Sequence, residues 1–122
     1  MTIGHVQGNK PFVSVTFLLP NQPAFSLECV VDTGFAGYLT LPEKAVEVLK
    51  LPFLQTIPSR LADGSRVMLD SYLTTIRWAE QQRPVEVVAT GLQPLIGRAL
   101  LQGFLVRIDF RDGGDITLET SS

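Results

Sequence analysis

Residues 30–35 of the chain read VVDTGF, and together with PLIGRALL at residues 94–101 they decide the prediction of the fold. In the first stretch, apolar β-branched residues lead directly into an aspartate, so the acid follows the end of a buried strand. A strand end holds a carboxylate rigidly, and catalysis requires rigid placement of its reactive groups. Asp32 is therefore the leading candidate for a catalytic residue.

The two residues after Asp32 add chemistry of their own. Thr33 carries a hydroxyl that can form a hydrogen bond across a symmetric interface. Gly34 lacks the Cβ that would keep backbone amides away from the carboxylate. An Asp-Thr-Gly tripeptide can also be a simple turn at the end of a strand. The function of this motif therefore depends on what the rest of the chain brings to it.

The composition is that of an ordinary folded domain. The chain has 122 residues, of which 45% are hydrophobic and 18% are charged, and its net charge is −2. This length fits one domain spanning residues 1–122. The interspersed charges predict neither nucleic acid nor a membrane surface as a partner. Because the sequence has no long apolar segment and no signal pattern, we expect a cytoplasmic location.

Cysteine, histidine and acidic residues give little support for other chemistries. Cys29 is the only cysteine and belongs to an apolar strand, which predicts a buried packing role. His5 is the only histidine; we expect its N-terminal stretch to be mobile, which disfavours a Ser-His or Cys-His hydrolase. Residues 112–115 lack the spaced acids of a calcium loop. The sequence thus predicts no metal site and no cofactor.

Short runs of β-branched and aromatic residues, separated by Gly, Pro and Asp, predict a mainly β protein. The expected strands are residues 12–19, 25–31, 56–62, 66–78, 84–89, 105–110 and 116–119, with a further strand pair around residues 80–83. We expect one short helix at residues 42–49, where proline suits the first helical position. A second is expected at residues 98–102, ended by Gly103.

The two motifs together resemble those of the retroviral-type, or retropepsin-like, aspartic proteases. VDTG at residues 31–34 is followed further along the chain by LIGRALL at residues 95–101, and the resemblance covers nearly the whole chain in motif order. In that family, two apolar residues and a glycine cross behind the active-site loop, and a short helix begins at the arginine. The matching positions are Leu95, Ile96, Gly97 and Arg98.

The resemblance implies the acid protease fold, a mainly β and closed or partly open barrel with one or two short helices and one lobe per chain. It implies an aspartic endopeptidase, in which two aspartates share one proton to activate a water and polarise the scissile carbonyl. The other aspartates considered do not suit as partners: Asp63 is expected in a turn, Asp70 along a flap strand, and Asp109 and Asp112 beside a distal hairpin. The second carboxylate is therefore expected from Asp32 of a second copy in a homodimer, with a peptide or protein as substrate.

The resemblance also assigns roles to residues outside the Asp-Thr-Gly motif. The turn at Ala62, Asp63 and Gly64 falls where the family carries its flap, a hairpin that closes over a bound peptide. Phe35 resembles a bacterial Asp-Thr-Gly-Phe variety of the family. The acid that pairs with the arginine in viral members is absent here, so Arg98 must find another carboxylate, a carbonyl or solvent.

Apolar residues near these motifs are candidates for the walls of a peptide-binding cavity: Phe35, Leu61, Leu92 and Ile96. Two alternatives to proteolysis stay open. The first is a dimeric peptide-binding module of the same fold with weak or absent catalysis. The second is a structural β-barrel subunit in which the paired motifs are a coincidence.

Overall fold

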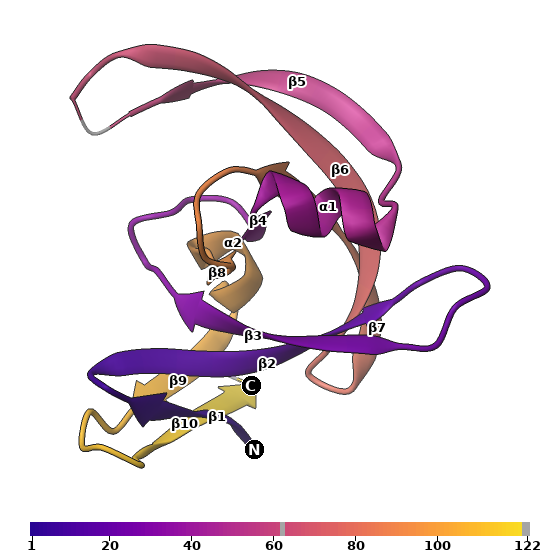
Figure 1. The fold of residues 1–122 in the computed structure, drawn as a ribbon. Coiled ribbons are helices and arrows are strands. Elements are labelled where there is room, and N and C mark those ends of the chain that lie inside the picture. Colours follow the sequence, from indigo (N-terminus) through magenta and orange to yellow (C-terminus); the bar gives the residue numbers. More distant parts are fainter. Residues whose placement is uncertain (62, 121–122) are drawn as a thin grey trace.

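The computed structural model describes residues 1–61 and 63–120. Ten strands and two short helices make up this part of the chain (Figure 1). In chain order they are β1 (Thr2–Gln7), β2 (Lys10–Leu18), β3 (Phe25–Val31), β4 (Leu39–Leu41), α1 (Glu43–Leu49), β5 (Phe53–Arg60), β6 (Arg66–Trp78), β7 (Gln81–Ala89), β8 (Leu95–Ile96), α2 (Arg98–Leu101), β9 (Phe104–Ile108) and β10 (Asp115–Thr120).

The strands belong to one sheet that curls until it meets itself. The strand order is β5-β6-β7-β4-β8-β3-β2-β1-β10-β9, and β6 pairs in addition with β2. The strands from β6 round to β2 therefore form a closed ring (Figure 1). The β5–β6 hairpin extends from one side of this ring, and β1, β10 and β9 continue the sheet from the other. The predicted mainly β fold with short helices is confirmed.

The hydrophobic core contains buried side chains from strands of the ring and from β1 and β10. Along β2, the side chains of Val13, Val15 and Phe17 are fully buried, as the period-two alternation of a strand with one inward face requires. Ile76 on β6 and Ile96 on β8 are fully buried as well. Burial of each such side chain contributes about 1.5–3 kcal/mol to folding. The core therefore fixes the positions of the strands that carry the two motifs.

Both helices are short and lie close to their predicted positions. α1 begins after Pro42 and buries Val46 and Leu49. It ends at Lys50, which adopts a left-handed conformation with φ 54°. α2 follows Gly97 directly. No helix in residues 1–61 and 63–120 is both long and apolar enough to cross a membrane.

The N-terminal stretch is a strand, and the expectation that it is mobile was wrong. β1 pairs with β2 on one side and with β10 on the other. Gly4 makes the pairing with β2 possible, since a Cβ at this position would overlap the carbonyl oxygen of Phe12. His5 lies within this paired strand, which continues the sheet beyond β2 and outside the closed ring.

Two further segments differ from the prediction. Ala79 and Glu80 form the turn between β6 and β7, with φ values of 51° and 66°. β7 is consequently one continuous strand, where the sequence predicted a strand pair followed by a returning strand. β4 was not predicted at all, because its three residues are buried on both faces and show no alternation.

Cys29 faces the core from β3, and its side chain is fully buried. Burial, with a smaller contribution from the charge of Glu28, raises the pKa of its thiol to about 12. Because the thiolate is the reactive form, we expect Cys29 of the folded protein to resist alkylation by iodoacetamide for hours at mildly alkaline pH. It should react within minutes once guanidinium unfolds the chain. Mass spectrometry measures both rates, and fast labelling of the native protein would contradict the buried position.

Candidate active site

The loop between β3 and β4 carries the Asp-Thr-Gly motif. The backbone N–H of Asp32 donates to the carbonyl of Ile96 at 2.9 Å. β8 runs parallel to β3, with Val30 opposite Leu95 and Val31 opposite Ile96. The second motif thus lies beside the first and supports the strand end from which Asp32 emerges.

Gly97 occupies the point where the two motifs touch. A Cβ at this position would overlap the carbonyl oxygen of Gly37 and lie 2.5 Å from the ring of Phe35. The N–H of Gly97 donates to the carbonyl of Tyr38 at 2.9 Å, and the N–H of Arg98 donates to the carbonyl of Phe35 at 2.8 Å. The start of α2 is therefore bonded to the active-site loop, and only glycine leaves room for this contact.

The Asp32 carboxylate is partly buried and held by its own loop. Its Oδ1 accepts a hydrogen bond from the N–H of Gly34 at 2.9 Å, and the N–H of Phe35 donates to the Asp32 carbonyl at 3.1 Å. A Cβ at Gly34 would lie 3.1 Å from Oδ1, so the glycine permits the close approach of its amide. Thr33 and Gly34 are exposed beside the carboxylate. This geometry presents a carboxylate of fixed orientation at the protein surface.

A cavity of about 610 Å³ opens beside Asp32. Its walls come from the active-site loop, β4, the β5–β6 hairpin, the end of β7 and β8, and most of the lining residues are apolar. The lining residues are Asp32, Gly34, Phe35, Thr40, Ile57, Ser59, Arg60, Leu61, Leu69, Val88, Thr90 and Leu95. Of these lining residues, Asp32 alone carries a carboxylate. A concave apolar site with a few convergent polar groups suits a bound ligand with apolar side chains.

Two of the four predicted wall residues line this cavity. Phe35 and Leu61 do so, whereas Leu92 is 99% exposed and Ile96 is fully buried in the core. Ile96 was wrongly predicted because alternate residues of a strand face opposite sides, and its neighbour Leu95 takes the cavity side. Leu92 was wrongly predicted because it lies in the loop between β7 and β8, where its side chain is exposed to solvent.

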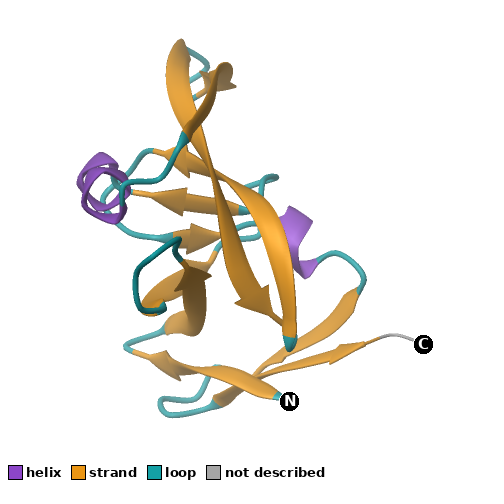
Figure 2. Ribbon diagram, turned by 90° about the vertical axis from the view of Figure 1, so that its right-hand side faces the viewer, coloured by secondary structure: helices purple, strands orange, loops and turns teal. Residues whose placement is uncertain are grey.

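The β5–β6 hairpin projects away from the ring, as Figure 2 shows. Its strands pair from Phe53 opposite Tyr72 to Arg60 opposite Arg66. In the turn, Gly64 has a φ of 87°. Ala62, which belongs to the predicted flap turn, lies outside the described residues.

Asp63 is engaged within the same turn. Its Oδ1 accepts hydrogen bonds from the Ser65 hydroxyl at 2.6 Å and from the Ser65 N–H at 2.9 Å. These bonds, the hydroxyl bond first, lower the pKa of the Asp63 carboxyl. Asp63 is therefore an ionised turn residue bonded to its own hairpin.

Two further aspartates form hydrogen bonds away from Asp32. Asp70 accepts from the Thr56 hydroxyl at 2.8 Å. The Arg111 guanidinium bonds Asp109 at 2.6 Å and holds the pKa of that carboxyl at about 2. None of these acids lines the Asp32 cavity. Residues 1–61 and 63–120 also contain no group of three or more His, Cys, Asp or Glu side chains that could hold a metal ion.

Arg98 begins α2, and its side chain is exposed. It borders a second hollow of about 490 Å³ that also touches the active-site loop, with Thr33, Ala36, Ala99, Leu101 and Gln102. Within the described part of the chain, its guanidinium is in none of the ion pairs, which involve Arg107 and Arg111. Within these residues the structure therefore gives Arg98 no carboxylate partner.

Thr40 is a cavity residue that the sequence did not indicate. It is 3% exposed, and among the described residues its hydroxyl has no hydrogen-bond partner. Ile57, Ser59 and Leu69 also line the cavity, and they occupy alternate positions of β5 and β6. The alternation of side chains along these strands divides their residues between two faces. It does not show which face turns toward Asp32, so these residues could not be predicted from it alone.

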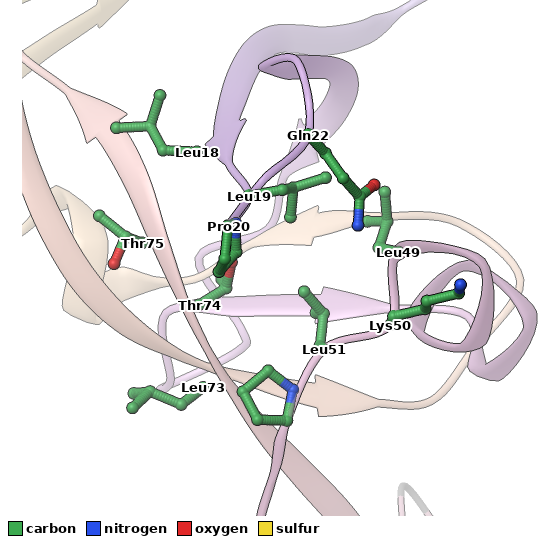
Figure 3. Close-up of a pocket in the computed structure, with 11 residues that line it drawn as sticks. Leu18, Leu19, Pro20, Gln22, Leu49, Lys50, Leu51, Leu73, Thr74 and Thr75 are labelled. Carbon is green, nitrogen blue, oxygen red and sulfur yellow. The ribbon is translucent and has the colours of Figure 1, made fainter.

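A smaller hollow of about 280 Å³ lies between the β2–β3 turn, the end of α1 and β6 (Figure 3). Leucine and proline side chains form most of its wall. The lining residues are Leu18, Leu19, Pro20, Gln22, Leu49, Lys50, Leu51, Pro52, Leu73, Thr74 and Thr75. They include no acid and no histidine, so this hollow offers no group for acid–base hydrolysis.

The arrangement of strands is similar to that of a solved structure. The crystal structure of a retropepsin-like aspartic protease from Rickettsia conorii matches with a TM-score of 0.62, over 100% of this chain and 91% of that one, at 15% sequence identity. The chain has the retropepsin-like fold. This likeness confirms the fold that the two motifs predicted. The sequence matches no family model, and no curated protein matches it either.

Proposed function

We propose that this protein is an aspartic endopeptidase whose dyad consists of two Asp32 carboxylates, one from each subunit of a homodimer. The observation that supports it most strongly is the position of Asp32, at a rigid strand end and beside an apolar cavity that contains no other acid among the described residues. The retropepsin-like fold supports the same reaction class. Two carboxylates are needed for this chemistry, and one chain contributes one of them.

The chemistry follows from two carboxylates that share a proton. Two carboxylates held close together cannot both ionise easily, so the active pair shares one proton. The ionised carboxylate removes a proton from a water, whose oxygen attacks the scissile carbonyl carbon. The protonated partner hydrogen-bonds the carbonyl oxygen, and a proton then passes to the leaving amine. Cleavage should therefore fall at alkaline pH, where the shared proton is lost.

The surface around Asp32 offers an interface for the second copy. Thr33 is exposed beside Asp32 and borders the hollow formed with α2. β9 follows α2 and is the last strand of the sheet, so one of its edges has backbone groups that a strand of another chain can pair. Leu105 on this strand is 45% exposed. A twofold axis through this face would bring each Asp32 toward its twin.

The β5–β6 hairpin is proposed to act as the flap. Its inward side chains Ile57, Leu61 and Leu69 line the cavity that contains Asp32. An extended peptide can pair its backbone with strand edges while alternate side chains enter cavities. The hairpin would thus hold a peptide against the two carboxylates and exclude water from the reaction.

Mixing of subunits tests the shared dyad. Wild-type protein is combined with Asp32→Asn protein in rising proportion, under conditions in which subunits exchange, and cleavage of a random peptide library is measured. If each site needs both carboxylates, activity follows the square of the wild-type fraction, so an equal mixture retains about one quarter. Dilution with Asp112→Asn protein, altered in a distal hairpin, is the matched control and should leave activity unchanged.

Two other outcomes of the mixing experiment would count against the shared dyad or against catalysis altogether. A linear decline, or cleavage by a species that ultracentrifugation shows to be monomeric, would contradict the shared dyad. The alternative of a silent peptide-binding module predicts that wild-type dimers bind library peptides and cleave none at any pH.

A further inference from the structure

Two arginines face each other at the end of the β5–β6 hairpin. Arg60 is the register partner of Arg66, in the last strand pair before the turn. Like charges directly opposite each other on antiparallel strands are unfavourable. Both side chains are exposed, and within residues 1–61 and 63–120 the ion pairs involve other arginines. No contact of this arginine pair within the described residues stabilises the fold of a single chain.

Nearby acids do not neutralise the arginine pair. The carboxylate of Asp63 is bonded to Ser65 within the turn, and Asp70 accepts a hydrogen bond from Thr56 further along the hairpin. Between residues 60 and 66 there are two arginines and one aspartate, a net charge of +1, whereas the whole chain carries −2. The hairpin end is therefore a local positive site on an acidic protein.

Arg60 also lines the cavity that contains Asp32. The rest of the wall is mostly apolar, so an apolar side chain of a peptide can fill the cavity next to the carboxylate. The neighbouring residues of such an extended peptide would then pass along the hairpin end. A guanidinium binds a carboxylate through two parallel hydrogen bonds, and this bidentate geometry is selective for acids.

We infer that Arg60 and Arg66 are specificity-determining residues that bind an acidic side chain, Asp or Glu, flanking an apolar residue at the scissile bond. This inference rests on the proposed function and names its substrate class. The homodimer would present two hairpins related by a twofold axis. The acidic preference is therefore expected on both sides of the scissile bond.

Paired peptides that differ by one Glu-to-Gln change at a flanking position test the inference. The measured quantity is the ratio of kcat/KM for the Glu peptide to kcat/KM for the Gln peptide. We expect a ratio of about 5 to 10 for wild type, since an exposed ion pair is modest and bidentate pairing strengthens it. The ratio should fall to about 1 in the Arg60→Gln/Arg66→Gln double variant and shrink as salt screens the charges.

Two single variants sharpen this comparison. Arg60→Lys keeps the charge and loses the bidentate geometry, so it should retain an intermediate ratio. Arg77→Gln removes the same charge from the far end of β6, where the side chain is also exposed. It should retain the wild-type ratio, which separates a local effect of the hairpin end from a change in total charge.

The outcomes separate this inference from the proposed function. If wild type cleaves Glu and Gln peptides equally at every flanking position, the inference is overturned and aspartic proteolysis stands. If no peptide is cleaved, proteolysis fails, and fluorescence anisotropy with the same labelled peptides decides the inference. Preferential binding of the Glu peptide that the double variant loses would support it, and equal binding would overturn it. A last outcome concerns contacts between the two hairpins of the dimer. If Arg60→Gln and Asp63→Asn each lower kcat/KM equally for the Glu and the Gln peptide, the arginine pairs with Asp63 of the other hairpin, and the inference is overturned.

Discussion

Asparagine in place of Asp32 is expected to reduce peptide cleavage by about 1,000-fold or more, because proton transfer by a positioned side chain contributes about 10²- to 10⁴-fold and a homodimer loses both carboxylates. The side chain keeps its shape. Its amide oxygen can still accept the hydrogen bond that the Gly34 N–H makes to Oδ1 at 2.9 Å. The loop and the interface should therefore survive the substitution.

Cleavage rates, circular dichroism and sedimentation of Asp32→Asn and wild type give the comparison. Asp112→Asn serves as the control for the same chemical change at a surface hairpin and should cleave like wild type. If pure Asp32→Asn protein keeps a tenth of the activity with its dimer intact, Asp32 does not perform the proton transfer. If it unfolds, the loss of activity reports on stability, and the mixing experiment with folded variants decides.

Alanine in place of Gly97 is expected to destabilise the fold by about 3 kcal/mol, at the upper end of the usual cost of overpacking, and to lower cleavage sharply. The added Cβ would overlap the carbonyl oxygen of Gly37 and lie 2.5 Å from the Phe35 ring. The backbone cannot move away without breaking the bonds from Gly97 to Tyr38 and from Arg98 to Phe35. The loop that carries Asp32 must therefore shift.

Urea unfolding measures the change in free energy of unfolding for Gly97→Ala. Gly113→Ala is the matched control, since a Cβ there meets nothing within 4 Å and only its φ of 82° is unfavourable for alanine. That conformation costs roughly 1–2 kcal/mol, and the distal hairpin should leave cleavage unaffected. Equal destabilisation by the two substitutions, with cleavage retained in both, would contradict tight packing between the motifs.

Much of the fold could be predicted because several elements obey local rules. β2 alternates buried and exposed residues, Pro42 precedes α1, and Gly64 supplies the positive φ of a tight turn. β1 was missed although one of its pairings is local: it forms a hairpin with β2 across Gly8 and Asn9, whose φ values are 56° and 68°, and a Gly-Asn pair between two strands is a hairpin signal. Its other pairing, with Thr2 opposite Thr117 at the other end of the chain, is not local and could not be predicted from that stretch.

The candidate site was predictable where a motif fixes the backbone and not where tertiary register decides. The motifs around Asp32 and Gly97 indicated the loop and the strand beside it. Whether Leu95 or Ile96 faces the cavity depends on how β8 fits between β3 and β4. The same holds for Thr40, whose strand is buried on both faces and carries no signal of its own.

The change of partners along β6 has a mechanical consequence. β6 pairs with β7 from Ser71 onward, and before that point it pairs with β5 alone. Ser71 is fully buried, and its hydroxyl bonds Glu86 on β7 at 2.6 Å and the Gln55 carbonyl on β5 at 3.1 Å. The part of the hairpin beyond Ser71, where β6 pairs with β5 alone, can therefore bend without breaking a hydrogen bond between β6 and β7. Its arginine end would travel furthest, while the strand that supports Asp32 stays still.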